Sequence, residues 1–282
     1  MGKILEVNKI YFKLKNDLIK ERAKIKRPLC LASVITTEDS SSKIYLSMQK
    51  NMAYDLKVKY IPVEIERNAS CKKIIKKIEK LNKDKEITGI ILNKPFPKNI
   101  NESSISQTIA PDKDIEGINP YNLGMLCIGK PIFIPPTVLS ILEILKSIKI
   151  KIYGKDVTII GFSTIIGKPL AMLLGEKFAT VNITHIGTYE ANRLPFYVAQ
   201  ADILISAVGK PHIIKGDWIK KGAIVIDVGI AAKENKIVGD IEVDLAIKNA
   251  SYISPVPGGV GKLTPLFLFK NLFKATKLNK FI

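Results

Sequence analysis

Short runs of apolar residues alternate with amphipathic stretches along most of this chain. In the second half the runs predict four buried strands, within residues 157–160, 181–185, 201–209 and 223–230. Each of these runs ends near a glycine or at the start of a helical pattern. Because strands that alternate with helices are typical of a doubly wound parallel sheet, we expect residues 135–255 to form an α/β domain of this kind.

The first half shows a similar alternation. Apolar runs at residues 29–35, 60–65 and 87–92 predict three strands, and helices are expected over residues 3–27, about 43–57 and from Ser70 to near Leu81. A polar turn at residues 38–42 is expected to cap the second of these helices. Two prolines precede a further helix over about 138–148, and we place a domain boundary at residues 134–135.

The first strand of the second half runs directly into a glycine-rich turn, GFSTIIG, at residues 161–167. Pro169 stands where the first turn of a helix tolerates proline, and residues 170–174 continue the helix. A strand, a glycine turn and a helix together aim backbone N–H groups and a positive helix end at a phosphate. The common G-x-G-x-x-G motif is only half present, so an ordinary strand-to-helix turn is the alternative interpretation.

Three loops carry further candidate chemistry. Residues 93–97 leave the strand at 87–92 through two prolines, and α/β sheets hold ligands at such strand ends. Residues 111–120 are acidic and rich in turn formers, which predicts either a surface loop or the wall of a substrate pocket. Residues 255–261 hold two prolines and three glycines, which favours a ligand-contacting loop over a linker, and a helix is expected from Thr264.

Composition narrows the class of protein. A chain of 282 residues with 46% hydrophobic and 25% charged residues is typical of a soluble globular protein of two domains. It has neither an 18-residue apolar run nor a signal peptide, so we expect no membrane association. Three dispersed cysteines predict reduced thiols in the cytoplasm, and two histidines without paired cysteines argue against a metal site.

The net charge of +18 comes almost entirely from lysines that are spread along the chain. A solvated lysine surface explains this charge most simply, and steering of an anionic substrate or cofactor is compatible with it. The lysines form no block interleaved with aromatic residues, so we expect no nucleic-acid partner.

Several motifs follow one another in the order of a known family. In the second half they are G-x-S-x-I-I-G-x-P at 161–169, AVGKP at 207–211, GAIVIDVGI at 222–230 and PVPGGVG at 255–261. In the first half they are Ser42-x-x-Tyr45 and Pro111-x-Lys113-Asp114-x-x-Gly117-x-x-Pro120-x-Asn122-x-Gly124. Over nearly its whole length the chain resembles the bifunctional methylenetetrahydrofolate dehydrogenase/methenyltetrahydrofolate cyclohydrolase family.

The resemblance implies a two-domain α/β fold. A folate-binding catalytic domain would comprise residues 1–134 and 256–282, with its last helix packing back on it, and residues 135–255 would form a Rossmann-like NAD(P)-binding domain. It also implies that tetrahydrofolate derivatives bind between the domains and that the protein is a homodimer. The expected reactions are oxidation of 5,10-methylenetetrahydrofolate and hydrolysis of the methenyl product to 10-formyltetrahydrofolate.

The resemblance places the cofactor at turns that follow the strands of the second domain. The implied contacts are Gly161, Phe162, Ser163, Ile165, Gly167, His185, Ile186, Ala207, Val208, Gly209, Asp227, Gly229 and Ile230. An NAD-type site has an acidic residue after its second strand to hold the ribose hydroxyls, and here the first acid is Glu190. This difference and the positive charge favour NADP over NAD, without a metal.

The family's catalytic pair is a tyrosine and, four residues later, a lysine whose ammonium serves hydrolysis. Tyr45 matches the tyrosine, but residue 49 is glutamine, which can orient water and cannot titrate. Lys50 lies about 100° around the helix, so Lys94 is the candidate replacement cation. The implied catalytic residues are therefore Tyr45, Gln49 and Lys94. The implied substrate-binding residues are Tyr45, Asn93, Pro95, Glu116, Pro257, Gly258 and Gly259.

Three other interpretations bear on these expectations. A dehydrogenase that has lost hydrolysis would explain Gln49 directly. A short-chain dehydrogenase is excluded, because its Tyr/Lys pair follows the glycine turn whereas Tyr45 precedes it. A basic nucleic-acid-binding protein on an inactive Rossmann scaffold would show salt-sensitive binding and no folate-dependent reduction of a nicotinamide.

Overall fold

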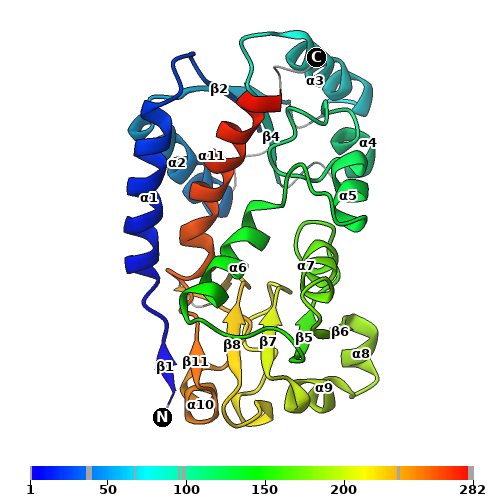
Figure 1. Ribbon diagram of the computed structural model, residues 1–282. Helices are drawn as coiled ribbons and strands as arrows, with labels where there is room; N and C mark the ends of the chain where they lie inside the picture. Colours follow the sequence, from blue (N-terminus) through cyan, green and yellow to red (C-terminus); the bar gives the residue numbers. More distant parts are fainter. Residues whose placement is uncertain are drawn as a thin grey trace. The chain divides into compact units, whose positions relative to one another are not determined.

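The computed structural model describes residues 2–35, 40–66, 68–94, 96, 100–233 and 236–278, with the backbone alone at residues 40–43. The chain divides into two compact units (Figure 1). Unit 1 comprises residues 1–12 and 137–264, and unit 2 comprises residues 13–136 and 265–282. Residues 1–12 and 256–264, which the sequence assigns to the N-terminal domain, therefore group with the other unit.

Unit 1 is built on a parallel sheet in which the described strands have the order β1-β11-β8-β7-β5-β6. These strands are β1 (Lys3–Ile4), β5 (Asp156–Ile160), β6 (Thr180–Thr184), β7 (Ile203–Ser206), β8 (Ile224–Asp227) and β11 (Tyr252–Ile253). The four strands expected from the apolar runs are confirmed as β5, β6, β7 and β8. Ile160 pairs with Ser206 and Ser206 with Asp227, so β5, β7 and β8 end side by side at one edge.

Short helices connect these strands. They are α6 (Pro136–Ser147), α7 (Gly167–Gly175), α8 (Ile186–Glu190), α9 (Leu194–Gln200), the 3-10 turn η1 (Gly216–Trp218) and α10 (Val243–Asn249). Leu204, Val225 and Ile253 of the sheet share a core with Val198 of α9 and Ala246 of α10. A short antiparallel hairpin, β9 (Ala231–Lys233) and β10 (Lys236–Val238), follows β8. The doubly wound α/β fold expected for this part of the chain is confirmed.

The start of the chain differs from the expected helix. Residues 3–4 form strand β1, and the helix α1 spans Val7–Ala23. Lys3 pairs with Tyr252 and Ile4 with Ile253, so β1 extends the sheet of unit 1 at its edge. A pairing between segments so far apart leaves no local periodicity in a two-residue strand, which explains the error.

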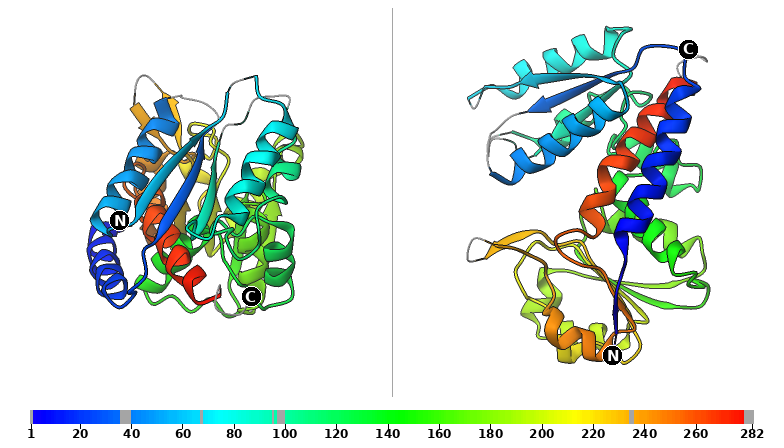
Figure 2. Two further views of the ribbon diagram at one scale, coloured as in Figure 1. Left: turned by 90° about the horizontal axis from the view of Figure 1, so that it is seen from above. Right: turned by 90° about the vertical axis from the view of Figure 1, so that its left-hand side faces the viewer.

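Unit 2 contains a three-stranded parallel sheet in the order β3-β2-β4, which confirms the three strands expected in the first half. Its strands are β2 (Cys30–Ile35), β3 (Lys59–Glu64) and β4 (Gly89–Asn93), and its helices include α2 (Ser40–Asp55), α3 (Cys71–Lys83), α4 (Glu102–Ser106) and α5 (Pro120–Cys127). Figure 2 shows α2 and α3 on opposite faces of this sheet. Val34 and Ile90 pack with Ile74 and Ile78 of α3, whereas Ser33 faces the side of α2.

The helix starts were predicted with mixed success. Ser70 caps α3 as expected, because its hydroxyl accepts a hydrogen bond from the Lys73 N–H at 3.3 Å. Glu38 and Asp39 of the polar turn expected at residues 38–42 lie outside the described residues, and the rest of that turn is the start of α2, which begins at Ser40.

The last helix, α11, begins at Val260 and ends at Leu278. It therefore starts four residues before the expected position and contains Pro265. Asn271 donates hydrogen bonds from Nδ2 to the carbonyl oxygens of Ile115 (2.8 Å) and Ile134 (2.9 Å), both in unit 2. The expected return of the last helix to the first domain is confirmed.

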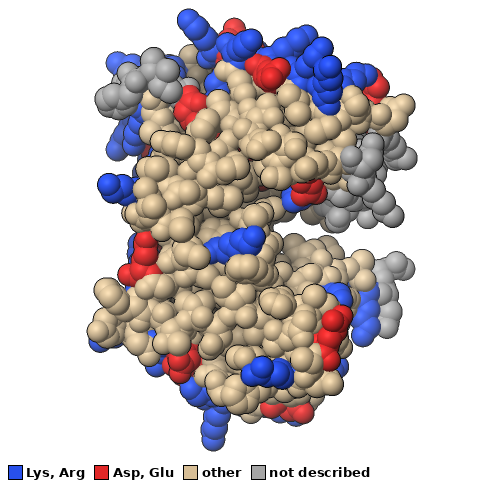
Figure 3. All heavy atoms as spheres, turned by 90° about the vertical axis from the view of Figure 1, so that its right-hand side faces the viewer, with Lys and Arg blue, Asp and Glu red and all other residues tan. Residues whose placement is uncertain are grey.

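The lysines gather more locally than their spread along the sequence suggests. On the face drawn in Figure 3, basic side chains crowd the upper part, where unit 2 lies. Helix α3 contributes the exposed Lys72, Lys73, Lys76 and Lys80 opposite its buried Ile74 and Ile78. Such a helix has one solvated and one packed face. Among the described residues, none of the helices is both long and apolar enough to cross a membrane.

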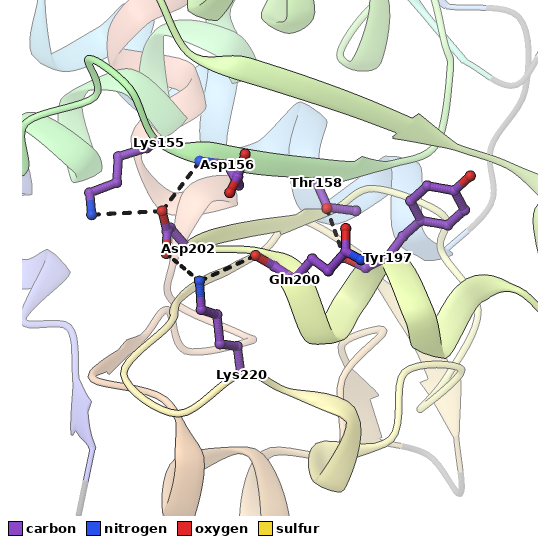
Figure 4. A network of polar contacts seen from close by, with 7 residues as sticks. All are labelled: Lys155, Asp156, Thr158, Tyr197, Gln200, Asp202 and Lys220. Atoms are coloured by element: carbon purple, nitrogen blue, oxygen red, sulfur yellow. Dashed lines mark hydrogen bonds and ion pairs between the residues drawn. The ribbon is translucent and has the colours of Figure 1, made fainter.

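The amino ends of β5 and β7 are joined by a charged network (Figure 4). Asp202 accepts hydrogen bonds from Lys220 Nζ (2.7 Å) and from the Asp156 N–H (3.3 Å), and Lys155 Nζ lies 3.7 Å away. Lys220 also donates to the carbonyl oxygen of Gln200 at 3.4 Å. These contacts hold the end of the sheet that is opposite the glycine turn.

Candidate functional site

The glycine turn connects β5 to α7 and lies against the carboxyl end of β7. Gly161 has φ of +112°, and a Cβ there would lie 2.6 Å from the carbonyl oxygen of Ala207. A Cβ on Gly167 would lie 2.1 Å from the carbonyl oxygen of Gly161. Both positions therefore require glycine so that strand, turn and helix can approach closely.

Helix α7 points its amino end at this turn. The N-cap residue Ile166 makes no side-chain capping bond, while Ser163 Oγ accepts from the Ile166 N–H at 3.1 Å. A helix start without a side-chain cap next to a glycine turn fits a phosphate group, which would accept from backbone N–H groups and interact with the helix dipole. The described turn therefore fits the phosphate end of a dinucleotide cofactor.

The other predicted cofactor residues of this edge divide into two groups. The side chains of Phe162, Ile186, Val208 and Ile230 are exposed, and Gly209 has φ of +73° in the loop after β7. Asp227, in contrast, is 1% exposed, and its carboxylate accepts hydrogen bonds from backbone N–H groups of the protein. Asp227 therefore shapes this edge from below rather than facing it.

A hollow of about 540 Å³ borders α8 and the segment that follows the loop after β7. Its lining includes Tyr189, Lys210, His212, Lys215 and Trp218. His185, a predicted cofactor residue, is the N-cap of α8. His212 has φ of +52°, a conformation that residues other than glycine seldom adopt. Sequence reasoning missed this hollow, because its basic residues come from a loop without periodic pattern.

In unit 2 a buried amide network occupies the position expected for catalysis. Gln49 on α2 is 0% exposed, and its Nε2 donates to Asn93 Oδ1 at 2.9 Å. Asn93 Nδ2 donates to Ser33 Oγ at 2.7 Å, and the Ser33 hydroxyl lies 3.4 Å from Gln49 Oε1. The Tyr60 hydroxyl lies 2.8 Å from Ser33 Oγ and 3.2 Å from Gln49 Oε1. The network is neutral and joins two residues that the sequence singled out.

Tyr45 and Glu116 add two titratable groups next to this network. Burial raises the pKa of the Tyr45 phenol, the charge of Glu116 raises it further, and a hydrogen bond with Gln49 lowers it. Burial also raises the pKa of Glu116 to about 7, although its carboxylate accepts from the Leu92 N–H at 2.9 Å. A carboxyl group with this pKa can both take up and release a proton near neutral pH.

Lys94 follows β4 and forms an ion pair with Glu102 of α4. Its charge lowers the pKa of Glu116, but this effect is smaller than those of burial, the Leu92 hydrogen bond and the charge of Asp114. Pro95 lies outside the described residues. Pro257, Gly258 and Gly259 form the turn before α11 in unit 1, where Gly258 has φ of +96°.

The acidic loop at residues 111–120 is a loop, as expected, but its centre is buried rather than exposed. Asp114 accepts from the Asn119 N–H at 2.7 Å and from Asn122 Nδ2 at 2.8 Å, and burial raises its pKa to about 6. Lys113 donates to the carbonyl oxygens of Leu81 (3.0 Å) and Asn82 (2.6 Å) near the end of α3. These hydrogen bonds tie the loop together and to the end of α3, so the loop can hold Glu116 against β4.

No metal site accompanies these residues: within the part of the chain that the structure describes, no three His, Cys, Asp or Glu side chains are placed to hold an ion together.

Comparison with known proteins places both units in one family. The catalytic domain of tetrahydrofolate dehydrogenase/cyclohydrolase matches residues 5–116, and the NAD(P)-binding domain of the same family matches residues 135–280. The bifunctional protein FolD of Geotalea daltonii is 40% identical over 281 residues, which cover 98% of this chain and 99% of that protein.

Solved structures agree with this assignment. The bifunctional FolD enzyme of Campylobacter jejuni is 33% identical, with a TM-score of 0.93 over 99% of this chain and 100% of that chain. The FolD of Trypanosoma brucei, complexed with NADP cofactor and inhibitor, is 30% identical, with a TM-score of 0.93 over 100% of this chain and 99% of that chain. The chain therefore belongs to the tetrahydrofolate dehydrogenase/cyclohydrolase family.

Proposed function

We propose that this protein oxidises 5,10-methylenetetrahydrofolate with NADP and hydrolyses the resulting 5,10-methenyltetrahydrofolate to 10-formyltetrahydrofolate. Family membership over both units supports the pair of reactions. The observation that carries the oxidation is the uncapped start of α7 beside the Gly161–Gly167 turn at the carboxyl edge of the sheet. That edge is where doubly wound sheets bind dinucleotides.

The oxidation depends on positioning. A folate nitrogen donates its lone pair to the one-carbon bridge, a C=N bond forms, and the hydride leaves from the bridge carbon. The nicotinamide cofactor supplies a hydride acceptor when it is bound. No side chain has to gain or lose a proton in this step, so the neutral Gln49 is compatible with it.

Two observations favour NADP over NAD. The end of β6 and the residues that follow it, Thr184-His185-Ile186, offer no carboxylate to hold free ribose hydroxyls. Lys210 and His212 line the hollow beside α8, where a cation would attract an additional phosphate. We expect kcat/KM for NADP to exceed that for NAD by at least tenfold when initial rates of nicotinamide reduction are compared. Equal values, or a preference for NAD, would contradict this choice.

Hydrolysis makes a different demand. Water adds to the methenyl carbon, one proton of that water ends on the ring nitrogen when its C–N bond breaks, and the other is released. A group is needed that can accept and return a proton, and Gln49 cannot do so. We assign this role to Glu116, since its pKa of about 7 and its position near Tyr45 suit proton transfer.

The assignment is tested by Glu116→Gln. We expect hydrolysis of methenyltetrahydrofolate above the buffer rate to fall by about 100-fold, because general acid–base catalysis contributes roughly that factor or more. Nicotinamide reduction should fall by less than about tenfold. The exposed Glu86→Gln in the same unit is the matched control and should change neither rate. Equal losses of both activities in Glu116→Gln would mean that Glu116 binds the folate without transferring a proton.

A second candidate is a dehydrogenase without hydrolysis. It is favoured by one observation: Gln49 is buried and both ends of its amide are engaged by Asn93 and Ser33. Wild-type protein that reduces the nicotinamide but leaves the decay of methenyltetrahydrofolate at the buffer rate would establish this candidate. Gln49→Lys, which restores the family's residue, should then introduce measurable hydrolysis.

Two expectations accompany the proposed function. The cysteines Cys30, Cys71 and Cys127 are free thiols, which suits the proposed cytoplasmic location. We also propose a homodimer, and sedimentation equilibrium at micromolar concentration would test it against a monomer.

A further inference from the structure

Two buried aspartates lie beneath the loops that follow β7 and β8. Asp227 ends β8, and Asp240 follows the β9–β10 hairpin. They are 1% and 0% exposed. Burying a carboxylate is unfavourable unless hydrogen bonds replace its lost hydration, so the partners of both groups are informative.

Asp240 binds the loop after β7. Its Oδ2 accepts from Ser206 Oγ at 2.6 Å and from the Val208 N–H at 2.8 Å, and its Oδ1 accepts from the Lys210 N–H at 2.9 Å. One carboxylate thus satisfies backbone groups on both sides of Gly209, which has φ of +73°. Both of its oxygens have to be acceptors for this geometry to hold.

Asp227 binds the backbone that leads into and out of the hairpin. Its Oδ1 accepts from the N–H groups of Gly229 (2.9 Å) and Asp240 (3.2 Å), and its Oδ2 accepts from the Ile241 N–H at 3.1 Å. Through the N–H of Asp240, this carboxylate fixes the residue that in turn fixes the loop after β7.

Two glycines let the carboxylates approach this closely. A Cβ on Gly229 would lie 2.1 Å from Asp240 Oδ1, and a Cβ on Gly239 would lie 2.0 Å from Asp227 Oδ2. Asp240 therefore occupies the space that a side chain on Gly229 would fill, and Asp227 occupies the space that a side chain on Gly239 would fill. The two loops and the hairpin are locked together by this reciprocal packing.

We propose that Asp240 is a positioning residue for the nicotinamide cofactor, acting through the backbone of residues 207–210, with Asp227 holding it in place. The proposal rests on the proposed function, which places the cofactor at this edge of the sheet. Neither carboxylate touches the cofactor, since both are enclosed by protein. They set the path of the loop that presents Val208 and Gly209, and the sequence gives no local sign of this role for Asp240.

Asp240→Asn tests the proposal, because an amide has only one acceptor oxygen. Its NH₂ group would face the N–H of Val208 or of Lys210, so one of these hydrogen bonds would be replaced by two donors that face each other. We expect the Kd for NADP, measured by calorimetry without folate, to rise by at least tenfold. The KM for NADP should rise with it, while kcat and the KM for the folate change by less than about threefold. The exposed Asp244→Asn on α10 is the matched control and should bind NADP as the wild type does.

Ser206→Ala provides a second measurement should Asp240→Asn fail to fold. It removes one of three hydrogen bonds to Asp240, and we expect about a threefold rise in Kd. Wild-type Kd values in the folded variants, even with lowered thermal stability, would overturn the inference and leave the proposed function standing. Wild-type protein that binds NADP without oxidising the folate would overturn the proposed function and leave this binding test in force.

Discussion

The two ends of the sheet in unit 1 use aspartate in opposite ways. At the amino ends of β5 and β7, Asp202 is paired with Lys220 and Lys155, and the hydrogen bond from Lys220 holds its pKa below the usual range (Figure 4). At the carboxyl ends, Asp227 is bound by backbone N–H groups, and burial raises its pKa to about 7.

Asp202 at the amino end is explained by a small contribution to stability, whereas Asp227 at the carboxyl end is explained by function. Partly exposed ion pairs such as Asp202–Lys220 contribute about 0–1 kcal/mol and are screened by salt. A buried carboxylate carries a desolvation penalty, so it is weak evidence for stability and is better explained by the backbone geometry that it fixes. Ligands bind at the carboxyl end of the sheet in this class of fold, and this is the end that carries the desolvation penalty of a buried carboxylate.

The largest effect is expected from Gly229→Ala. The new Cβ would overlap the buried Asp240 carboxylate, and we expect the free energy of unfolding of unit 1 to fall by about 3 kcal/mol. Urea unfolding followed by the fluorescence of Trp218, the single tryptophan, measures this directly. Gly175→Ala at the end of α7, where a Cβ meets open space, is the control. It should unfold at the same urea concentration as the wild type or at a slightly higher one. Equal effects of the two changes would show that the carboxyl end is loosely packed.

A second effect appears in the pH dependence of stability. Because the pKa of Asp227 is raised in the folded protein, the folded state binds more protons than the unfolded state between about pH 4 and 7, and stability falls as pH rises through that range. Glu116 and Asp114 act in the same direction. We expect Asp227→Asn to lose about 2.5 kcal/mol less between pH 5 and pH 7 than the wild type does. Parallel curves for the two proteins would contradict the raised pKa.

The smallest effect is expected at the amino end. Lys220→Met removes an ion pair whose side chains are 41% and 26% exposed, so the free energy of unfolding should fall by less than about 1 kcal/mol at low salt and by still less at high salt. The contribution of Asp202 has the opposite sign with pH, since it is present above the unfolded pKa and is lost as pH falls through the lowered folded pKa. A changed Kd for NADP in Lys220→Met would contradict the claim that only the carboxyl end of the sheet supports cofactor binding.

The local spacing of apolar and polar residues was sufficient to predict strands β2 to β8. The apolar residues 157–160 between a charged start and a glycine predicted β5, its turn and the ligand-binding edge. Order of motifs, rather than any one motif, carried the family assignment.

The features that were missed depend on pairing and hydrogen-bond partners that no local periodicity reveals. Strand β1 exists because Ile4 pairs with Ile253, and the loop around Asp114 is buried because Asn119 and Asn122 supply its hydrogen bonds. Asp240 shows no periodicity and no motif of its own; its role depends on Val208 and Lys210, which lie some thirty residues earlier. The acidic, turn-rich composition of residues 111–120 allowed either a surface loop or a pocket wall, and hydrogen bonds within the loop make its burial possible.

Hydrogen–deuterium exchange of the wild-type protein with and without NADP tests the contrast between the two ends most directly. We expect NADP to slow exchange of backbone amides at residues 161–168, 207–210 and 228–230, and to leave the amino-end segments at 153–156, 200–202 and 220–223 unchanged. Protection confined to the carboxyl-end loops would confirm that the cofactor binds at the edge beneath which the buried aspartates lie. Protection at the amino end, or equal protection at both ends, would contradict the account.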